Sequence, residues 1–172
     1  MRRAVGDAVY GVDDETLEGA VKDACVRRRA TLAVAESCTG GLVMDRLTNA
    51  PGSSKYLRGG VVAYHNDLKR GWLGVSAATL AREGAVSAAV ARAMAEGIRQ
   101  HTGATVGVGL TGIAGPTGGS ARKPVGLVYL ALADGRRTRV RRCKFHGDRL
   151  AIKTQTAQTA LDWLRRWALG TM

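Results

Sequence analysis

Residues 31–41 read TLAVAESCTGG, and this stretch decides the fold. Residues 31–35 form an apolar run with β-branched members, which predicts a strand buried on both faces. Apolar residues at helical spacing resume at Leu42, so the intervening turn presents the free N–H groups that begin a helix. Such groups stabilise a phosphate or a developing oxyanion. Ser37 or Cys38 would then be a nucleophile beside an anion hole; the alternative is that Ser37 or Thr39 only caps the helix.

Outward from this stretch, predicted helices alternate with predicted strands. The strands are residues 31–35, 59–64 and 104–110, followed by a hairpin of 125–133 and 137–145 across the turn Asp134-Gly135. The helices begin at Asp13 or Asp14, Gly41, Asn66, Ser76, Ser87 and Asp148. This order predicts an α/β fold, a three-layer α/β/α sandwich with a mixed, mostly parallel sheet of about five strands.

Three of these elements carry a further prediction. Residues 137–145 bear cations on both faces, which places this strand at a sheet edge, where charge deters edge-to-edge association. The last helix has one continuous apolar seam, and the strand at 59–64 is predicted to be buried. The seam consists of Leu150, Thr154, Ala157, Leu161, Leu164 and Ala168.

The composition bounds the class of protein. The chain has 172 residues, of which 45% are apolar and 23% charged, as is typical of one soluble globular domain. We expect an N-terminal arm over residues 1–12, which lack periodicity, and a single domain over residues 13–172. No apolar run approaches the ~20 residues that cross a bilayer, and no signal-peptide core follows Met1. A cytoplasmic protein without a membrane partner is therefore predicted.

Cysteine usage and net charge limit the partners. Cys25, Cys38 and Cys143 form an odd set without a C-x-x-C pair, which predicts free thiols and no zinc site; we expect no metal and no cofactor. The net charge of +12 favours an anionic partner, either a phosphorylated small molecule or nucleic acid. Only 5% of residues are aromatic, so base stacking has little support and nucleic acid is the less favoured partner.

The second predicted strand delivers polar groups to one rim. Tyr64 and His65 follow it, Asn66 is a predicted N-cap, and Lys69 lies one turn into the next helix. A serine hydroxyl needs a base, and a lysine can serve if burial lowers its pKa by roughly three units from ~10.4. Tyr64 would relay the proton. The alternatives are a solvated Lys69 and a Cys38–His65 catalytic pair.

Residues 111–120, TGIAGPTGGS, form a glycine-rich loop after the third strand. Such a loop either approaches a ligand closely with its backbone or simply turns. Thr111 adds a hydroxyl to the same rim, or else bonds to its own loop. Gly107, Gly109 and Gly112 match the G-x-G-x-x-G dinucleotide fingerprint, but two of them lie inside the strand and no helix follows, so that reading is disfavoured.

Several motifs in this order resemble those of a known family. The chain carries AESCTGG at 35–41, PGSS at 51–54, Tyr64-x-Asn66-x-x-Lys69, GAVS at 84–87, GIAGP at 112–116 with GG at 118–119, KPVG at 123–126 and GDR at 147–149. Together they resemble the CinA C-terminal domain family, whose single-domain members are the PncC-type nicotinamide-nucleotide amidases. The resemblance covers about residues 14–168.

The resemblance implies hydrolysis of nicotinamide mononucleotide to nicotinate mononucleotide and ammonia. It implies Ser37 as nucleophile, assisted by Lys69 and Tyr64 with Thr111 in the site, and a homo-oligomer of three-layer domains. His65 departs from the family pattern, which often has serine there. The alternatives are a non-catalytic nucleic-acid or competence-associated binding module and a Cys38-dependent hydrolase.

The substrate must also be anchored, and its phosphate needs donors. If the N–H groups at Thr39-Gly40-Gly41 form the oxyanion hole, the phosphate lies elsewhere, because one set of donors cannot do both. The predicted substrate-binding residues are Cys38, Thr39, Gly40, Gly41, Asn66, Gly112, Gly115, Gly118, Gly119, Lys123 and Arg149.

Overall fold

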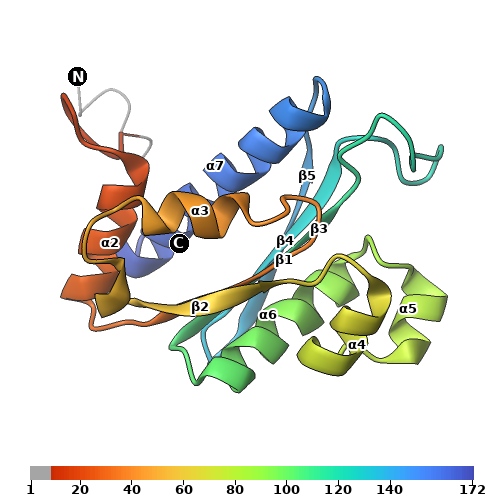
Figure 1. Ribbon diagram of the computed structural model, residues 1–172, viewed down its shortest axis with the longest axis horizontal. Coiled ribbons are helices and arrows are strands. Elements are labelled where there is room, and N and C mark those ends of the chain that lie inside the picture. Colours follow the sequence, from red (N-terminus) through yellow and green to blue (C-terminus); the bar gives the residue numbers. More distant parts are fainter. Residues whose placement is uncertain (1–8) are drawn as a thin grey trace.

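A five-stranded sheet forms the middle layer of the computed structural model, which describes residues 9–172 (Figure 1). Its strands are β1 (Leu32–Glu36), β2 (Leu57–Val62), β3 (Val106–Gly112), β4 (Leu127–Ala133) and β5 (Thr138–Lys144). Their spatial order is β2-β1-β3-β4-β5. Strand β1 pairs in parallel with β2 and β3, whereas the β3–β4 and β4–β5 pairs are antiparallel. The predicted mixed sheet of five strands is confirmed, although parallel and antiparallel pairings are equal in number because the hairpin adds two antiparallel pairs.

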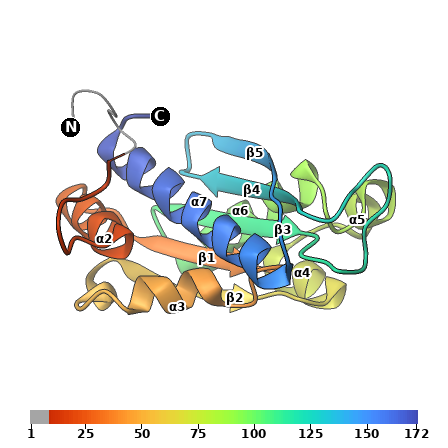
Figure 2. The ribbon, with the colours of Figure 1, turned by 90° about the horizontal axis from the view of Figure 1, so that it is seen from above.

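Helices cover both faces of this sheet, as Figures 1 and 2 show from two directions. Helices α2 (Leu17–Arg27), α3 (Leu42–Thr48) and α7 (Arg149–Leu169) lie on one face. Helix α6 (Ala88–Thr102) packs on the other face, with α4 (Asn66–Leu73) and α5 (Ala77–Glu83) beside it. A short 3-10 turn, η2 (Ser53–Lys55), precedes β2. The predicted three-layer sandwich is therefore confirmed.

The alternation of side chains along β1 explains why the strand can be apolar throughout. Leu32 and Val34 enter the core shared with α2 and α7, whereas Ala33 and Ala35 enter the core shared with α4 and α6. All five residues of β1 are buried. Successive strand residues point to opposite faces, so a central strand between two helical layers has no polar face.

The helices begin at polar side chains, mostly where the sequence predicts them. Ser76, Ser87 and Asp148 each accept a hydrogen bond from a backbone N–H of the first turn that follows. Two predictions were wrong. The first helix is capped by Thr16 rather than Asp13 or Asp14, and α4 is capped by His65 rather than Asn66, because His65 holds the extended backbone that a cap requires.

Of three further sequence-based predictions, two are wrong in part or in full and one is confirmed. Strand β2 is a half-exposed edge strand rather than a buried one. The charged strand β5 occupies the other edge, as predicted. In α7 the first part of the predicted seam is wrong: Leu150 is 67% exposed and Ile152 is buried in its place. The first turn of α7 extends past the core to the rim at the carboxyl ends of the strands, where Arg149 forms its hydrogen bonds.

Glycines allow α6 to approach β3 closely. A Cβ atom added to Gly109 would lie 2.3 Å from the Ala91 carbonyl oxygen and 2.6 Å from the Ala95 nitrogen. One added to Gly107 would lie 2.2 Å from the Ala95 carbonyl oxygen. These glycines of the apparent dinucleotide fingerprint are therefore packing residues beneath a helix.

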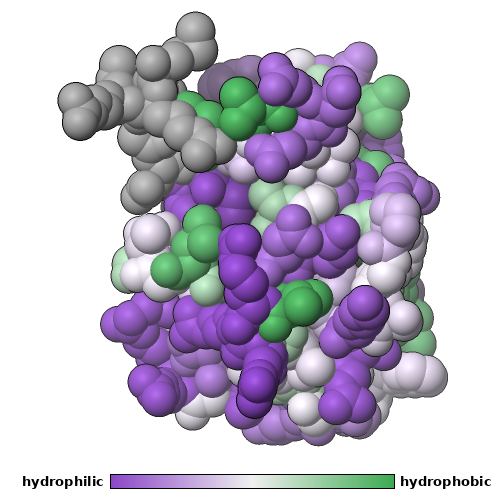
Figure 3. Space-filling model, turned by 90° about the vertical axis from the view of Figure 1, so that its left-hand side faces the viewer, coloured by the Kyte–Doolittle hydropathy of each residue, from purple (hydrophilic) through white to green (hydrophobic). Residues whose placement is uncertain are grey.

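The end of the molecule near α2 is covered largely by hydrophilic side chains, with isolated apolar ones among them (Figure 3). This end carries the amino ends of β1 and β2 (Figure 1), so the carboxyl ends of these strands lie at the opposite end. Among the described residues, no helix is both long and apolar enough to cross a bilayer.

Gly109→Ala should lower the free energy of unfolding by about 3 kcal/mol, because backbone atoms of α6 cannot move aside for a methyl group. Gly71→Ala is the matched control. Its added Cβ meets nothing within 4 Å inside α4, so it should stabilise the protein by roughly 0.5–1 kcal/mol. Urea unfolding followed by circular dichroism measures both. Equal stability of Gly109→Ala and wild type would contradict the close packing of α6 on β3.

Candidate active site

The candidate site lies where the chain changes direction across the sheet. From β1 the chain proceeds to β2 on one side, and then crosses to β3 on the other side of β1. In open α/β sheets the crevice at such a switch point, beyond the carboxyl ends of the strands, is the usual place for a ligand. Ser37 directly follows β1, and Thr111 and Gly112 end β3. The two strand ends thus bring a hydroxyl from each side of the crevice.

A cavity of about 310 Å³ occupies this position. It is lined by Ser37, Cys38, Tyr64, Asn66, Lys69, Ala85, Val86, Thr111, Gly112, Ile113, Ala114, Gly115, Thr117, Gly118 and Arg149. These residues come from β3 and from five separate segments that meet at one end of the sheet. A larger hollow of about 600 Å³ beside β5 is lined by Arg141, Lys144 and Arg166 among others, and contains none of this constellation.

Glu36 organises the turn that carries Ser37. Its fully buried carboxylate accepts hydrogen bonds from the backbone N–H groups of Gly41 (3.0 Å), Val43 (3.2 Å) and Met44 (2.8 Å). A carboxylate at a helix N-terminus is stabilised by the free N–H groups and by the helix dipole. The start of α3 therefore already holds an anion of the chain itself, and these three donors are not available to a substrate.

This role of Glu36 was not predicted from the sequence, although a signal was present. An acidic residue directly before a turn and a helix is a candidate for the N-terminal donors. Burial raises the pKa of the Cys38 thiol, and the backbone of Cys38 and Thr39 opposes this with smaller effects. The Gly40 N–H donates to the Ser37 carbonyl within the turn. Thr39, Gly40 and Gly41 do not line the cavity.

Lys69 is buried, with 1% of its surface exposed, so the solvated alternative is wrong. Its Nζ donates to the carbonyl oxygens of Ala63 (2.8 Å) and Tyr64 (2.9 Å), which lie at the end of β2. Burial disfavours the charged amine and lowers the pKa of Lys69, against a smaller opposing effect of Cys38. A neutral amine has two hydrogens and one lone pair. When Lys69 is neutral, the two carbonyls take both hydrogens and the lone pair is left to accept a proton.

Tyr64 and Arg149 form the rim of the cavity. The Tyr64 hydroxyl accepts a hydrogen bond of 2.9 Å from Nη2 of Arg149, and Nη1 of Arg149 donates to the Gly115 carbonyl at 2.9 Å. Arg149 thus joins the end of β2 to the glycine-rich loop. Tyr64 is 59% exposed, and its hydrogen bond to Lys69 is made by its backbone carbonyl. Asn66 also lines the cavity, from the first turn of α4.

Thr111 is buried at the end of β3, and its hydroxyl donates to the Ala85 carbonyl at 2.8 Å. The alternative that it bonds to its own loop is therefore wrong. Gly112, Gly115 and Gly118 line the cavity, whereas Gly119 does not. Lys123 also lies outside the lining, because its Nζ donates to the Glu83 carbonyl at the end of α5. Ala85, Val86, Ile113, Ala114 and Thr117 line the cavity as well, and as single residues they gave no signal of a site.

The proposed Cys38–His65 pair finds no support in the geometry. Burial raises the pKa of the Cys38 thiol to about 12, so the thiol stays protonated. His65 is exposed, its Nδ1 accepts from the Asp67 N–H, and it does not line the cavity. Cys25, Cys38 and Cys143 are free thiols, and among the described residues no three His, Cys, Asp or Glu side chains gather as they would around a metal ion.

Fold and site together define a class of α/β protein with a buried lysine and a serine at one switch-point cavity. Residues 14–168 match the sequence model described as the CinA C-terminal domain, and the chain belongs to this family. It is similar to CinA-like proteins of Geobacter sulfurreducens (52% identical over 166 residues, 96% of this chain and 40% of the relative) and Desulfotalea psychrophila (49% over 169 residues, 98% and 41%). The chain spans about two fifths of the length of these relatives.

Solved structures of similar proteins have the same fold. A CinA superfamily protein of Klebsiella pneumoniae superimposes with a TM-score of 0.86 at 33% identity, over 90% of this chain and 96% of that one. A competence/damage inducible protein of Agrobacterium tumefaciens gives a TM-score of 0.81 at 38% identity, again over 90% and 96%. The family predicted from the sequence motifs is confirmed.

Cys38 should resist alkylation in the folded protein. With a pKa of about 12, only about one thiol in 10,000 is ionised at about pH 8. After treatment with iodoacetamide, mass spectrometry should find Cys38 unmodified in the native protein, Cys143 modified faster, and all three cysteines modified in urea. Rapid native modification of Cys38 would restore a thiolate to consideration.

Proposed function

We propose that the protein is an amidohydrolase that converts nicotinamide mononucleotide to nicotinate mononucleotide and ammonia. The observation that carries the chemistry is that the buried Lys69 amine, whose Nζ donates to two carbonyls, lines the same cavity as Ser37. The substrate is inferred from membership of the CinA C-terminal domain family. The protein is further expected to act as a homo-oligomer and to need no cofactor.

In the first half-reaction Lys69 acts as the base. Its lone pair takes the proton of the Ser37 hydroxyl as the oxygen attacks the carboxamide carbon, and a tetrahedral intermediate forms. The C–N bond then breaks, and the Lys69 ammonium returns the proton to the departing nitrogen, which leaves as ammonia. A nicotinoyl ester on Ser37 remains. A base must be poised near the working pH, and burial shifts the pKa of the Lys69 amine downward, in that direction.

In the second half-reaction water replaces ammonia. Lys69 takes a proton from water as the water oxygen attacks the ester carbon, and the bond from that carbon to the Ser37 oxygen breaks. Ser37 regains a proton from the Lys69 ammonium, and the carboxylic acid that forms releases its own proton to water, so that the product leaves as a carboxylate. The same amine thus serves as base and acid in turn, so no second titrating group is required.

The developing oxyanion requires backbone donors beside Ser37. The N–H group of Cys38, a residue that lines the cavity, is proposed for this role, because Glu36 has taken those of Gly41, Val43 and Met44.

The remaining lining divides into an apolar wall and a polar rim. Ala85, Val86 and Ile113 offer the apolar surface against which an aromatic base packs. Arg149 has five N–H donors, of which two are used by Tyr64 and Gly115, so the others are free for a phosphate. The volume of about 310 Å³ falls at the lower end of the range for small-molecule sites.

Ser37→Ala should reduce ammonia release from nicotinamide mononucleotide by about 1,000-fold or more, because the nucleophile is removed while the fold is kept. Ser54→Ala is the matched control, since Ser54 is exposed and lies before β2 rather than in the cavity. A coupled assay for ammonia with the purified protein measures both. Equal rates for Ser37→Ala and wild type would end the serine mechanism.

A further inference from the structure

The segment between α5 and α6, residues 83–87, forms the apolar wall of the cavity. Ala85 and Val86 line it directly. The segment has no strand partner, so its position depends on side chains from other elements. Thr111 of β3 donates to the Ala85 carbonyl, and the hydroxyl of Ser87 donates to the Gly84 carbonyl at 3.1 Å.

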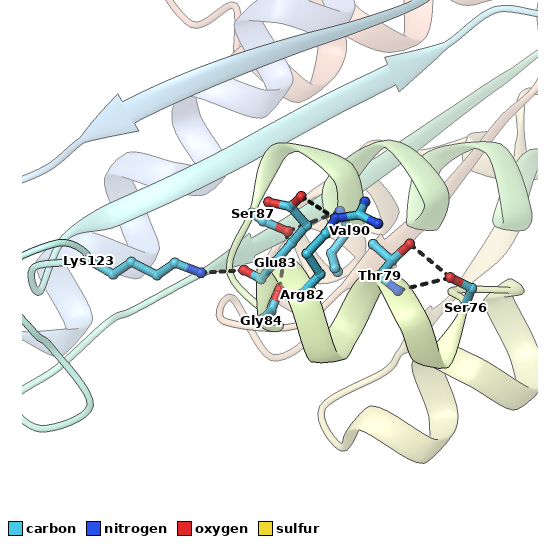
Figure 4. A network of polar contacts seen from close by, with 8 residues as sticks. All are labelled: Ser76, Thr79, Arg82, Glu83, Gly84, Ser87, Val90 and Lys123. Carbon is cyan, nitrogen blue, oxygen red and sulfur yellow. Dashed lines mark hydrogen bonds and ion pairs between the residues drawn. The ribbon is translucent and has the colours of Figure 1, made fainter.

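A further hydrogen bond comes from across the cavity. Lys123 belongs to the loop between β3 and β4, whose earlier residues Gly115, Thr117 and Gly118 also line the cavity. Its Nζ donates to the Glu83 carbonyl (Figure 4). The lysine therefore links two segments that both contribute to one cavity lining.

The local chemistry favours this link over an anion site. Glu83 is the last residue of α5, where the free carbonyl groups carry partial negative charge that a cation stabilises. The Glu83 carboxylate is engaged by Arg82, so the lysine bonds the backbone rather than the side chain (Figure 4). Lys123 is only partly exposed.

The neighbouring residues are adapted to the approach of this amine. A Cβ atom on Gly84 would lie 3.1 Å from Nζ of Lys123, and Gly84 has a positive φ of 68°. The backbone conformation thus favours glycine, and the absence of a Cβ leaves room for the amine. On the other side, Lys123 is fixed by a tight turn: its N–H donates to Ser120 Oγ, and its carbonyl accepts from the Ser120 N–H.

We propose that Lys123 is a positioning residue, which clamps residues 83–87 to the glycine-rich loop and so keeps Ala85 and Val86 where the base of the substrate packs. The inference rests on the proposed function for the identity of the ligand, and it assigns Lys123 a role other than contact with the phosphate. Loss of the clamp weakens ground-state and transition-state binding alike, because the wall touches the base rather than the reacting bond.

The test compares Lys123→Met, which keeps the length of the chain without the donor, with Lys123→Arg, which keeps a cationic donor. Lys123→Met should raise KM for nicotinamide mononucleotide about 5- to 10-fold with kcat within about twofold, and Lys123→Arg should restore most of the affinity. Lys144→Met is the matched control. Lys144 also donates to a backbone carbonyl, that of Val125, but outside the cavity, so KM should stay within about twofold.

Two further readouts separate positioning from other roles. Inhibition by nicotinamide riboside, which lacks the phosphate, should weaken by the same factor as KM rises; a loss confined to the phosphorylated compound would make Lys123 a phosphate ligand and overturn the inference. Amide hydrogen exchange across residues 80–88 should be about fivefold faster in Lys123→Met than in wild type or Lys144→Met.

The outcomes also separate this inference from the proposed function. Absence of ammonia release by the wild type would end the proposed function, and the exchange comparison would then decide the clamp alone. With an active wild type, an unchanged KM or an unchanged exchange rate in Lys123→Met overturns the inference and leaves the function intact.

Discussion

The burial of one amine is the constraint on which the site depends. Lys69 lies under the end of β2 and is held by two carbonyl oxygens of the segment that precedes α4. No carboxylate of residues 9–172 forms an ion pair with it, so burial lowers its pKa. Because the unfolded chain holds the proton more tightly, this burial lowers the stability of the fold below the ordinary pKa of 10.5, and the loss disappears as pH rises through that value. The fold thus gives up stability to bury the amine that the proposed mechanism uses as its base.

The rest of the architecture delivers groups to this amine. The switch in direction between β2 and β3 opens the crevice, β1 brings Ser37 to it, and β3 brings Thr111. The buried carboxylate of Glu36 fixes the first turn of α3, so the turn that carries Ser37 is held by an anion of the chain itself. Arg149 and Lys123 then tie the loops together from opposite sides. Each of these contacts joins segments that are held in place by the sheet.

Local features were predictable, and partners distant in the sequence were not. Spacing and turn chemistry predict β1, the Asp134-Gly135 hairpin and the caps Ser76, Ser87 and Asp148, because these depend on neighbouring residues. The burial of Lys69 is decided by tertiary packing. The sequence alone favours a solvated lysine on a helix surface. Likewise Lys123 bonds a carbonyl 40 residues away. The positive charge of Lys123 led to the prediction that it binds the phosphate. No residue near it in the sequence indicates that its partner is the Glu83 carbonyl. The resemblance of the motifs predicted the family, but it did not predict these tertiary contacts.

The protonation state of Lys69 tests the account most directly. Side-chain nitrogen NMR of the ¹⁵N-labelled protein, titrated between about pH 6 and 11, reports the protonation of Nζ of Lys69, with free lysine in the same buffer as the reference. Lys69 is expected to lose its proton below 10.5, because burial lowers its pKa. Loss of the proton at or above 10.5 would contradict the proposed mechanism, because an amine that stays charged in the cavity cannot remove the proton of Ser37.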